Sequence, residues 1–330
     1  AGHTNAHVMR MWRMEPVRGA RLTCVTDFSV AADSGKKQGT LAGCYEPEAM
    51  QIDLVRFCAA AGIRLVQAEV TGLDAEAGEL RFASRAAIRF DALSIGIGSV
   101  PRRDGVRFDD DGVPTVSIKP MQTLLARLDL ALAGLAERVP GRAWRIAIVG
   151  AGVAGCEVAF CLPGRLPKQG AGAAFELTII DKHDQVAGGL SDAARRRVTA
   201  EFARRDVRLR LGEAVTAVEA GGVRLADGSL VEADLVLWAT GAAAPPVLAR
   251  LGLPTDEAGF LLTRPTLQST GAANVFAVGD SGTLADGGTP KAGVYAVRQG
   301  PILWRNLARS LRGERLVNYE PQRGFLKLLN

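Results

Sequence analysis

The 330-residue sequence has no apolar run long enough to span a bilayer, and its N-terminal stretch lacks the apolar core of a signal peptide. Its five cysteines are too few for the disulfide framework of a chain this long. The three histidines, His3, His7 and His183, do not have the spacing of metal ligands. These absences predict a cytoplasmic protein without a metal site.

Dense runs of basic residues are also missing. The formal net charge is +5, and the arginines are scattered, as in Arg195–Arg197 and Arg204–Arg205. This distribution is typical of a solvated arginine-rich surface, so we expect no nucleic-acid partner. Weak attraction to an anionic membrane surface remains compatible with it. The hydrophobic content of 48% and the length are those of a globular chain with two domains.

The most informative segment runs from Ile146 to Glu157. It has the pattern of a buried strand that leads into Gly150-x-Gly152-x-x-Gly155 and then a helix. The first glycine permits a tight turn, the second lets the backbone approach a pyrophosphate, and the third lets the helix pack against the strand. A second strand ends at Asp181, where an acid can bind the ribose hydroxyls of NAD. The segment therefore predicts a dinucleotide site.

The two halves of the chain repeat one plan. Residues 61–98 and 206–241 both have the pattern of a helix end, a strand, a short β-meander and a strand that ends in glycine. Gly98 and Gly241 lie 143 positions apart, and Gly2 and Gly152 lie 150 apart. A near-constant offset indicates duplication. We expect an α/β fold with two Rossmann-like three-layer domains, each with a dinucleotide site.

The N-terminal copy is imperfect. Gly2, His3 and Thr4 stand where the glycine turn is expected, but Asn5 replaces the third glycine. A good second strand, 21–26, ends near Asp27, whereas the strand that should precede Gly2 is absent. Because that strand is central in a doubly wound sheet, we expect the chain to lack one short strand at its start.

Composition shifts predict the domain limits. Residues 101–116 form a charged connection, Pro120–Leu135 has the pattern of an amphipathic helix, and Pro140-Gly141 ends it. We expect a first part at 1–102, a linker and helix at 103–140, an inserted domain at 141–245, and the second part of the first domain at 246–330.

A third signal is Thr270–Asp280, a strand that ends in Gly279-Asp280. With two nucleotide units, it makes the chain resemble the pyridine nucleotide-disulfide oxidoreductase superfamily of flavoproteins, which includes type II NADH dehydrogenases. The chain is more closely similar to the NADH-dehydrogenase-like proteins that some bacteria fuse to selenide, water dikinase. The matching segments are Gly2–Thr4, Ser34–Gly35, Thr40–Gly43, Ile95–Ser99, Val116–Pro120 and Pro290–Pro301.

The resemblance implies roles in FAD binding. Asp280 would face the FAD ribitol, and Gly98-Ser99 and Gly241 would form the two connecting motifs. Ser34-Gly35 would lie beside the isoalloxazine. The helix that begins at Lys291-Ala292-Gly293 would point its N-terminus at the flavin pyrimidine ring, although an ordinary helix start after Pro290 has the same pattern.

The resemblance also implies that Glu157 lies where the nicotinamide meets the flavin, although a buried helix glutamate is the alternative. The segment Ser34–Gly39 departs from the resembled proteins by containing Lys36 and Lys37. Either lysine could pair with Glu157 beside the flavin, or both could be solvated loop lysines. Cys156 and Cys161 have C-x4-C spacing, but positions i and i+5 of a helix face different directions, so we expect buried small side chains.

These features predict FAD and NAD(H) as cofactors. NADP is less favoured, because Asp181 would repel a 2′-phosphate, although Lys182 weakens that preference. The implied reaction is hydride transfer from NADH to the flavin, followed by reduction of a second acceptor, either a quinone, a small molecule or a carrier protein.

Two alternatives remain open. One is a thiol or polysulfide reductase that uses Cys44, and the other is a non-catalytic docking module, suggested by the missing strand and the altered lysine segment. Peripheral membrane contact and a homodimer would involve regions beyond Asn330.

Overall fold

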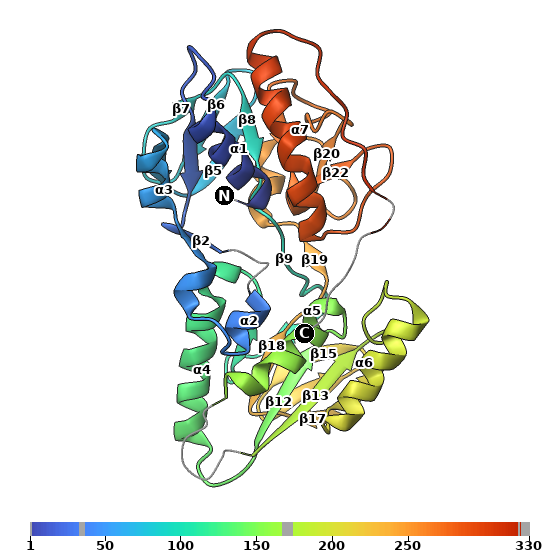
Figure 1. Ribbon diagram of the computed structural model, residues 1–330. Helices are drawn as coiled ribbons and strands as arrows, with labels where there is room; N and C mark the ends of the chain where they lie inside the picture. The colour runs from blue at the N-terminus through green and yellow to red at the C-terminus, as the bar shows by residue number, and fades with distance from the viewer. Residues whose placement is uncertain (1, 33–36, 167–173, 323, 325–330) are drawn as a thin grey trace. The chain divides into compact units, whose positions relative to one another are not determined.

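The computed structural model describes residues 2–32, 37–166, 174–322 and 324, and its chain divides into two compact units (Figure 1). The first unit is built from described residues within 1–33, 51–100 and 242–325. The second is built from those within 34–50, 101–241 and 326–330. Along the chain, the main part of the second unit is therefore inserted into the first.

A five-stranded parallel sheet forms the centre of the second unit. The strand order is β11 (Thr115–Ser117), β18 (Leu235–Trp238), β12 (Trp144–Val149), β13 (Phe175–Asp181) and β14 (Arg208–Leu211). The apolar residues of β12 and β18 are almost all buried, as expected for central strands. The order reverses between β12 and β18, and such a switch point is where doubly wound sheets bind ligands.

Helices and a second, small sheet complete this unit (Figure 1). Crossover helices follow β12 and β13, and the amphipathic helix expected near residues 120–135 is present after a short 3-10 turn. The antiparallel strands β15 (Val215–Glu219), β16 (Gly222–Leu225) and β17 (Leu230–Glu232) of the small sheet form the expected meander. The Phe108 ring packs edge-on against Trp238, with 5.0 Å between the ring centroids. The other elements are α2 (Lys37–Leu41), η1 (Pro47–Met50), η2 (Met121–Thr123), α4 (Leu124–Arg138), α5 (Val153–Cys161), η3 (Leu162–Gly164), α6 (Asp192–Arg204) and β10 (Arg107–Phe108).

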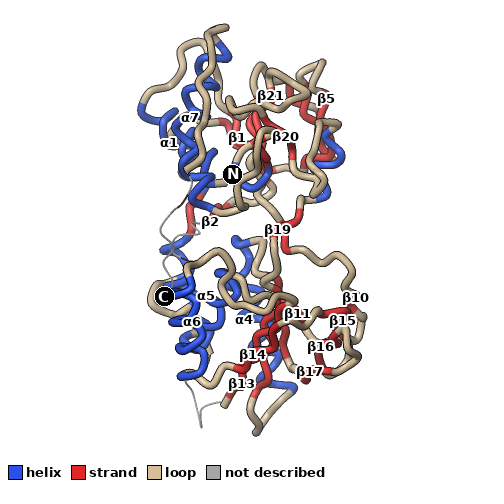
Figure 2. The backbone as a smooth tube through the Cα atoms, turned by 90° about the vertical axis from the view of Figure 1, so that its right-hand side faces the viewer, coloured by secondary structure: helices blue, strands red, loops and turns tan. Residues whose placement is uncertain are grey.

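The first unit contains separate parallel strand pairs, β1 (Thr23–Thr26) with β4 (Arg64–Gln67) and β21 (Val275–Ala277) with β8 (Leu93–Ile95). Among the described residues, no strand joins these two pairs. Helices α1 (His3–Met14) and α7 (Gly293–Leu311) lie side by side (Figures 1 and 2). The Thr4 hydroxyl donates to the Ala296 carbonyl at 2.7 Å, and Gly300 leaves room for the His7 ring, so the two helices pack closely.

Smaller elements complete the first unit. An antiparallel meander precedes β8, just as the meander of the second unit precedes β18. The predicted α/β fold class is confirmed, and the predicted duplication is visible in this repeated order. The elements are β2 (Val30–Ala32), β3 (Gln51–Asp53), α3 (Leu54–Ala60), β5 (Val70–Asp74), β6 (Glu79–Phe82), β7 (Ile88–Arg89), η4 (Pro246–Leu251), β20 (Leu261–Thr263), η5 (Gly279–Ser281) and β22 (Gly282–Leu284), with β9 (Val100–Pro101) and β19 (Ala242–Ala243) where the chain passes between the units.

In the part of the chain that is described, no helix has both the length and the apolar character needed to cross a membrane.

Candidate cofactor sites

The glycine turn of the second unit has the geometry that a dinucleotide requires. Gly150 has φ +112°, and a Cβ there would lie 2.5 Å from the Ala239 carbonyl oxygen. A Cβ on Gly155 would lie 1.8 Å from the Gly150 oxygen, so only glycine lets α5 pack this close. Gly152 caps α5, and a Cβ there would meet nothing within 4 Å. The helix N-terminus is therefore open beside Gly152, as a pyrophosphate site there would require.

Asp181 is fixed beside the same turn. Its Oδ2 accepts a hydrogen bond from the Ala151 N–H at 2.6 Å. Its Oδ1 accepts from the His183 N–H at 2.9 Å and lies 2.7 Å from His183 Nδ1. The carboxylate side chain is only 13% exposed. Asp181 therefore both orders the loop and places negative charge where the sequence predicts a ribose contact.

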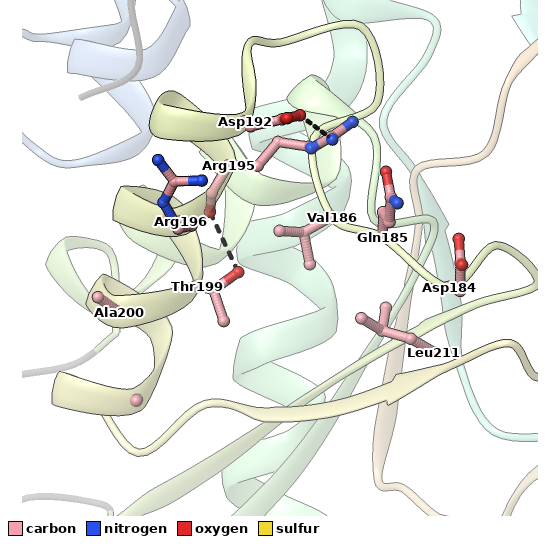
Figure 3. A pocket seen from close by; sticks show the side chains of 10 residues that line it. Asp184, Gln185, Val186, Asp192, Arg195, Arg196, Thr199, Ala200 and Leu211 are labelled. Atoms are coloured by element: carbon pink, nitrogen blue, oxygen red, sulfur yellow. Dashed lines mark hydrogen bonds and ion pairs between the residues drawn. The ribbon is translucent and has the colours of Figure 1, made fainter.

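A hollow of about 720 Å³ opens next to this loop, between α6 and the ends of β13 and β14 (Figure 3). Arg195 and Asp192 form an ion pair along α6, on one side of this hollow, and the Arg195 carbonyl oxygen accepts a hydrogen bond from the Thr199 hydroxyl. The lining residues are Asp184, Gln185, Val186, Asp192, Arg195, Arg196, Thr199, Ala200, Ala203 and Leu211. Its lining is mainly apolar and includes charged side chains of both signs.

Helix α5 carries Glu157 and the two cysteines. Glu157 is 8% exposed, and both Cys156 and Cys161 are buried. The Cys156 thiol donates to the Ala151 carbonyl at 3.3 Å, and burial raises its pKa to about 11. Because a protonated, buried thiol is a poor nucleophile, the structure agrees with the prediction that these cysteines pack as small side chains.

In the first unit, the imperfect glycine turn has a structural explanation. Gly2 caps α1 and donates to the Gly96 carbonyl at 3.1 Å. Asn5, which replaces the third glycine, accepts a hydrogen bond from the Ser94 hydroxyl at 2.7 Å. The asparagine thus ties α1 to β8 by a polar contact instead of by close backbone packing, a role that its position in the sequence did not reveal.

Three predicted segments meet around Asp280. The Ser99 hydroxyl donates to Asp280 Oδ2 at 2.6 Å, and the Ser281 hydroxyl accepts from the N–H groups of Ile97 and Gly98, both at 3.0 Å. The Gly279 N–H donates to Gln299 Oε1 of α7 at 2.6 Å. Gly279 has φ +59° and Gly98 has φ +79°, both in the left-handed region that favours glycine.

The sequence reasoning missed Ser281 and Gln299. Both are buried hydrogen-bonding residues that hold this turn, which we call the Asp280 turn (residues 279–282). Gln299 lies within the distinctive Pro290–Pro301 segment, so that signal pointed to the right region. Ser281 had no signal beyond its place after Gly279-Asp280.

The start of α7 lies where the sequence predicts it. Ala292 is the N-cap and Gly293 the first helical residue. The Lys291 ammonium points into the first unit, where it donates to the Gly282 carbonyl and the Thr283 hydroxyl, both at 2.7 Å. That contact network was not predicted.

The remaining predicted residues lie at several separate places in the structure. Asp27 is exposed after β1, His3 is the first residue of α1, and the Gly241 carbonyl accepts from the Arg102 N–H at 2.7 Å. Ser34, Gly35 and Lys36 lie outside the described residues. Lys37 begins α2 in the second unit, but its side chain also lies outside the description, so the predicted lysine–Glu157 pair stays a prediction.

Two further features bear on chemistry. Among the described residues, no group of three or more His, Cys, Asp or Glu side chains has a metal-binding arrangement.

Cys24 and Cys58 lie in one buried cluster, and burial together with the Cys24 thiol raises the pKa of Cys58 to about 11. Cys44 is the exposed cysteine of the five.

A family comparison now identifies the class of protein. Residues 28–300 match the family of pyridine nucleotide-disulphide oxidoreductases, and the chain belongs to this family. FAD and NAD(H) are the cofactors that this membership and the two glycine turns indicate. The predicted superfamily is thereby confirmed, while the closer resemblance to proteins fused with selenide, water dikinase stays a prediction.

Two curated relatives are similar over much of the chain. The demethylphylloquinone reductase of a Synechocystis strain is 27% identical over 83% of this chain and 69% of its own length. An NADH dehydrogenase-like protein of Mycobacterium tuberculosis is 30% identical over 70% of this chain and 58% of its own length. The chain thus spans only part of the length of each relative.

Solved structures show the same fold. The reduced CoADR-RHD of Bacillus anthracis superposes with a TM-score of 0.80 at 18% identity, over 97% of this chain and 57% of that one. The water-forming NADH oxidase of Lactobacillus brevis, solved with NADH, gives a TM-score of 0.76 at 19% identity, over 97% and 69% of the two chains.

Proposed function

We propose that the protein is an FAD-dependent NADH oxidoreductase that passes electrons from NADH, through its flavin, to a second acceptor. The observation that supports this most is the pair of glycine turns, one in each unit, with the Asp280 turn beside the first. When bound, FAD and NAD(H) supply the hydride and electron chemistry. The chain's residues bind and orient these cofactors.

In the proposed arrangement, the N-termini of α1 and α5 each receive a pyrophosphate, since each helix starts at a glycine with extended backbone. Asp280, held by Ser99, receives the ribitol hydroxyls of FAD. Glu157 lies near the nicotinamide and keeps the catalytic role that the family resemblance implies.

We propose NADH over NADPH as the electron donor. Asp181 and Asp184 place negative charge beside the expected ribose, and the nearby Arg195 already pairs with Asp192. A 2′-phosphate beside the ribose would be repelled by these carboxylates, most strongly by that of Asp181, whose side chain is only 13% exposed. Arg196 and Lys182 are the cations that oppose this preference.

For the acceptor, we propose a quinone, because a relative that matches 83% of this chain is named a demethylphylloquinone reductase. The alternative thiol or polysulfide acceptor would need Cys44, which is exposed. Cytoplasmic location, peripheral membrane contact and a homodimer stay predictions.

The test is to record the visible spectrum of the FAD-loaded protein without oxygen, before and after adding NADH. We expect the flavin band to bleach with NADH, and to bleach more slowly with NADPH. A soluble quinone added next should restore the band, and Cys44→Ala should leave both steps unchanged. A band that NADH does not bleach would contradict the proposed donor reaction, and failure to bind flavin would favour the docking-module alternative.

A further inference from the structure

Lys291 is a partly buried cation of the first unit, next to Ala292, the N-cap of α7. Its Nζ donates to the Gly282 carbonyl and the Thr283 hydroxyl, both at 2.7 Å, and lies 4.0 Å from the centre of the Phe260 ring. The ammonium therefore has two hydrogen-bond acceptors and an aromatic face. This is the set of partners that a buried cation needs.

The contacts continue beyond the lysine. The Thr283 hydroxyl accepts from Lys291 and donates to Asp256 Oδ2 at 2.7 Å. Asp256 Oδ1 in turn accepts from the N–H groups of Ala258 and Phe260, at 3.0 and 2.9 Å. The charged groups that face Lys291 are Asp256 and Asp280. One cation thus connects the 256–260 loop, strand β22 and the entry to α7.

These contacts lie next to the Asp280 turn. Gly282, whose carbonyl accepts from Lys291, ends the Asp280 turn, and Gln299 of α7 holds the other end through the Gly279 N–H. The turn is therefore clamped to α7 at both ends, by Lys291 before the helix and by Gln299 within it.

We propose that Lys291 is a positioning residue of the FAD site, which fixes the Asp280 turn and the start of α7 in one arrangement through Thr283 and Asp256. The lysine acts through these residues and need not touch the cofactor. The proposal rests on the first unit's assignment as the FAD site, and not on the identity of the donor or acceptor.

The test measures the FAD dissociation constant by quenching of flavin fluorescence. Lys291→Met should raise it about tenfold, because hydrogen bonds of a charged group are lost. Thr283→Val should raise the FAD dissociation constant less than Lys291→Met does. The double variant should bind FAD almost as well as Lys291→Met, because both residues act through the same hydrogen-bond network. Arg85→Met is the matched control, because Arg85 lies 5.3 Å from the Phe82 ring centre on the exposed surface of the same unit.

Chemical rescue separates positioning from general damage. In a Cys44→Ala background the four remaining native cysteines are buried, so Lys291→Cys can be alkylated with bromoethylamine to restore an ammonium of nearly the same length. We expect the modified protein to recover FAD affinity to within about threefold of the background protein.

Unchanged FAD affinity in both Lys291→Met and Thr283→Val would overturn the proposal, as would a failure of alkylation to restore affinity. If Lys291→Met does not fold, Thr283→Val alone decides the question. The wild-type spectrum with NADH tests the proposed donor reaction separately, so a failure of that reaction would leave this result interpretable.

Discussion

Two glycines of the second unit separate binding from packing at the scale of single residues. A Cβ on Gly155 would lie 1.8 Å from the Gly150 oxygen, whereas a Cβ on Gly152 would meet no protein atom within 4 Å. We expect Gly155→Ala to lower the free energy of unfolding by about 1–3 kcal/mol and to weaken NADH binding.

Gly152→Ala is the matched variant. It should change the free energy of unfolding by less than about 1 kcal/mol, because only the cap residue changes. It should nevertheless weaken NADH binding at least about tenfold, since the new methyl group occupies the space of the pyrophosphate. Urea unfolding and NADH titration check both variants, and equal NADH affinity for Gly152→Ala and wild type would show that the pyrophosphate lies elsewhere.

Lys291 also gives a pH prediction. Burial lowers the pKa of Lys291 to about 8, against the opposing effects of Asp256 and Asp280. Between that value and the ordinary pKa of lysine, the unfolded chain binds more protons than the folded chain, so the stability contribution rises with pH. We expect the free energy of unfolding of wild type, relative to Lys291→Met, to increase from about pH 7 to about pH 10. A flat or falling difference in urea unfolding would mean that this lysine keeps an ordinary pKa.

At the scale of elements, α1 and α7 pack closely where Gly300 meets His7. A Cβ on Gly300 would lie 2.8 Å from His7 Cβ, so Gly300→Ala should cost about 1–3 kcal/mol of stability despite the better helix propensity of alanine. His7→Gly, which deletes the His7 Cβ together with the ring, should remove most of this clash when the two changes are combined. Gly134→Ala in α4 is the control and should stabilise by about 0.5–1 kcal/mol, because its Cβ would meet only the flexible end of Arg138. If thermal unfolding shows that the stability losses of the two single variants simply add in the double variant, the proposed clash between positions 7 and 300 is wrong.

The elements themselves were largely predictable, because their signals are local. The strand, glycine turn and helix at 144–161 follow from the spacing of three glycines within one apolar segment. The contacts that complete the sites join residues far apart in sequence, and no local pattern predicts them. Asn5 binds Ser94, and Lys291 reaches Thr283 and through it Asp256. The sequence therefore predicted the strands, glycine turns and helices of these segments, but not the side chains that hold the segments in place.

At the scale of the whole molecule, the chain divides into two units. Because the proposed function places one cofactor site in each unit, each cofactor should stabilise its own unit. A ligand that binds only the folded state at about one hundred times its dissociation constant adds about 2.7 kcal/mol of stability. In calorimetry, NADH should raise the unfolding temperature of the transition that includes the second unit, and FAD should raise that of the first. Two variants assign the transitions to the units. Gly152→Ala should reduce the NADH shift to about half or less and keep the FAD shift, whereas Lys291→Met should reduce the FAD shift to about half and keep the NADH shift. If wild type and both variants instead show a single transition, whose unfolding temperature both cofactors raise equally, the two units unfold together. That result would also mean that neither Gly152 nor Lys291 serves its assigned site.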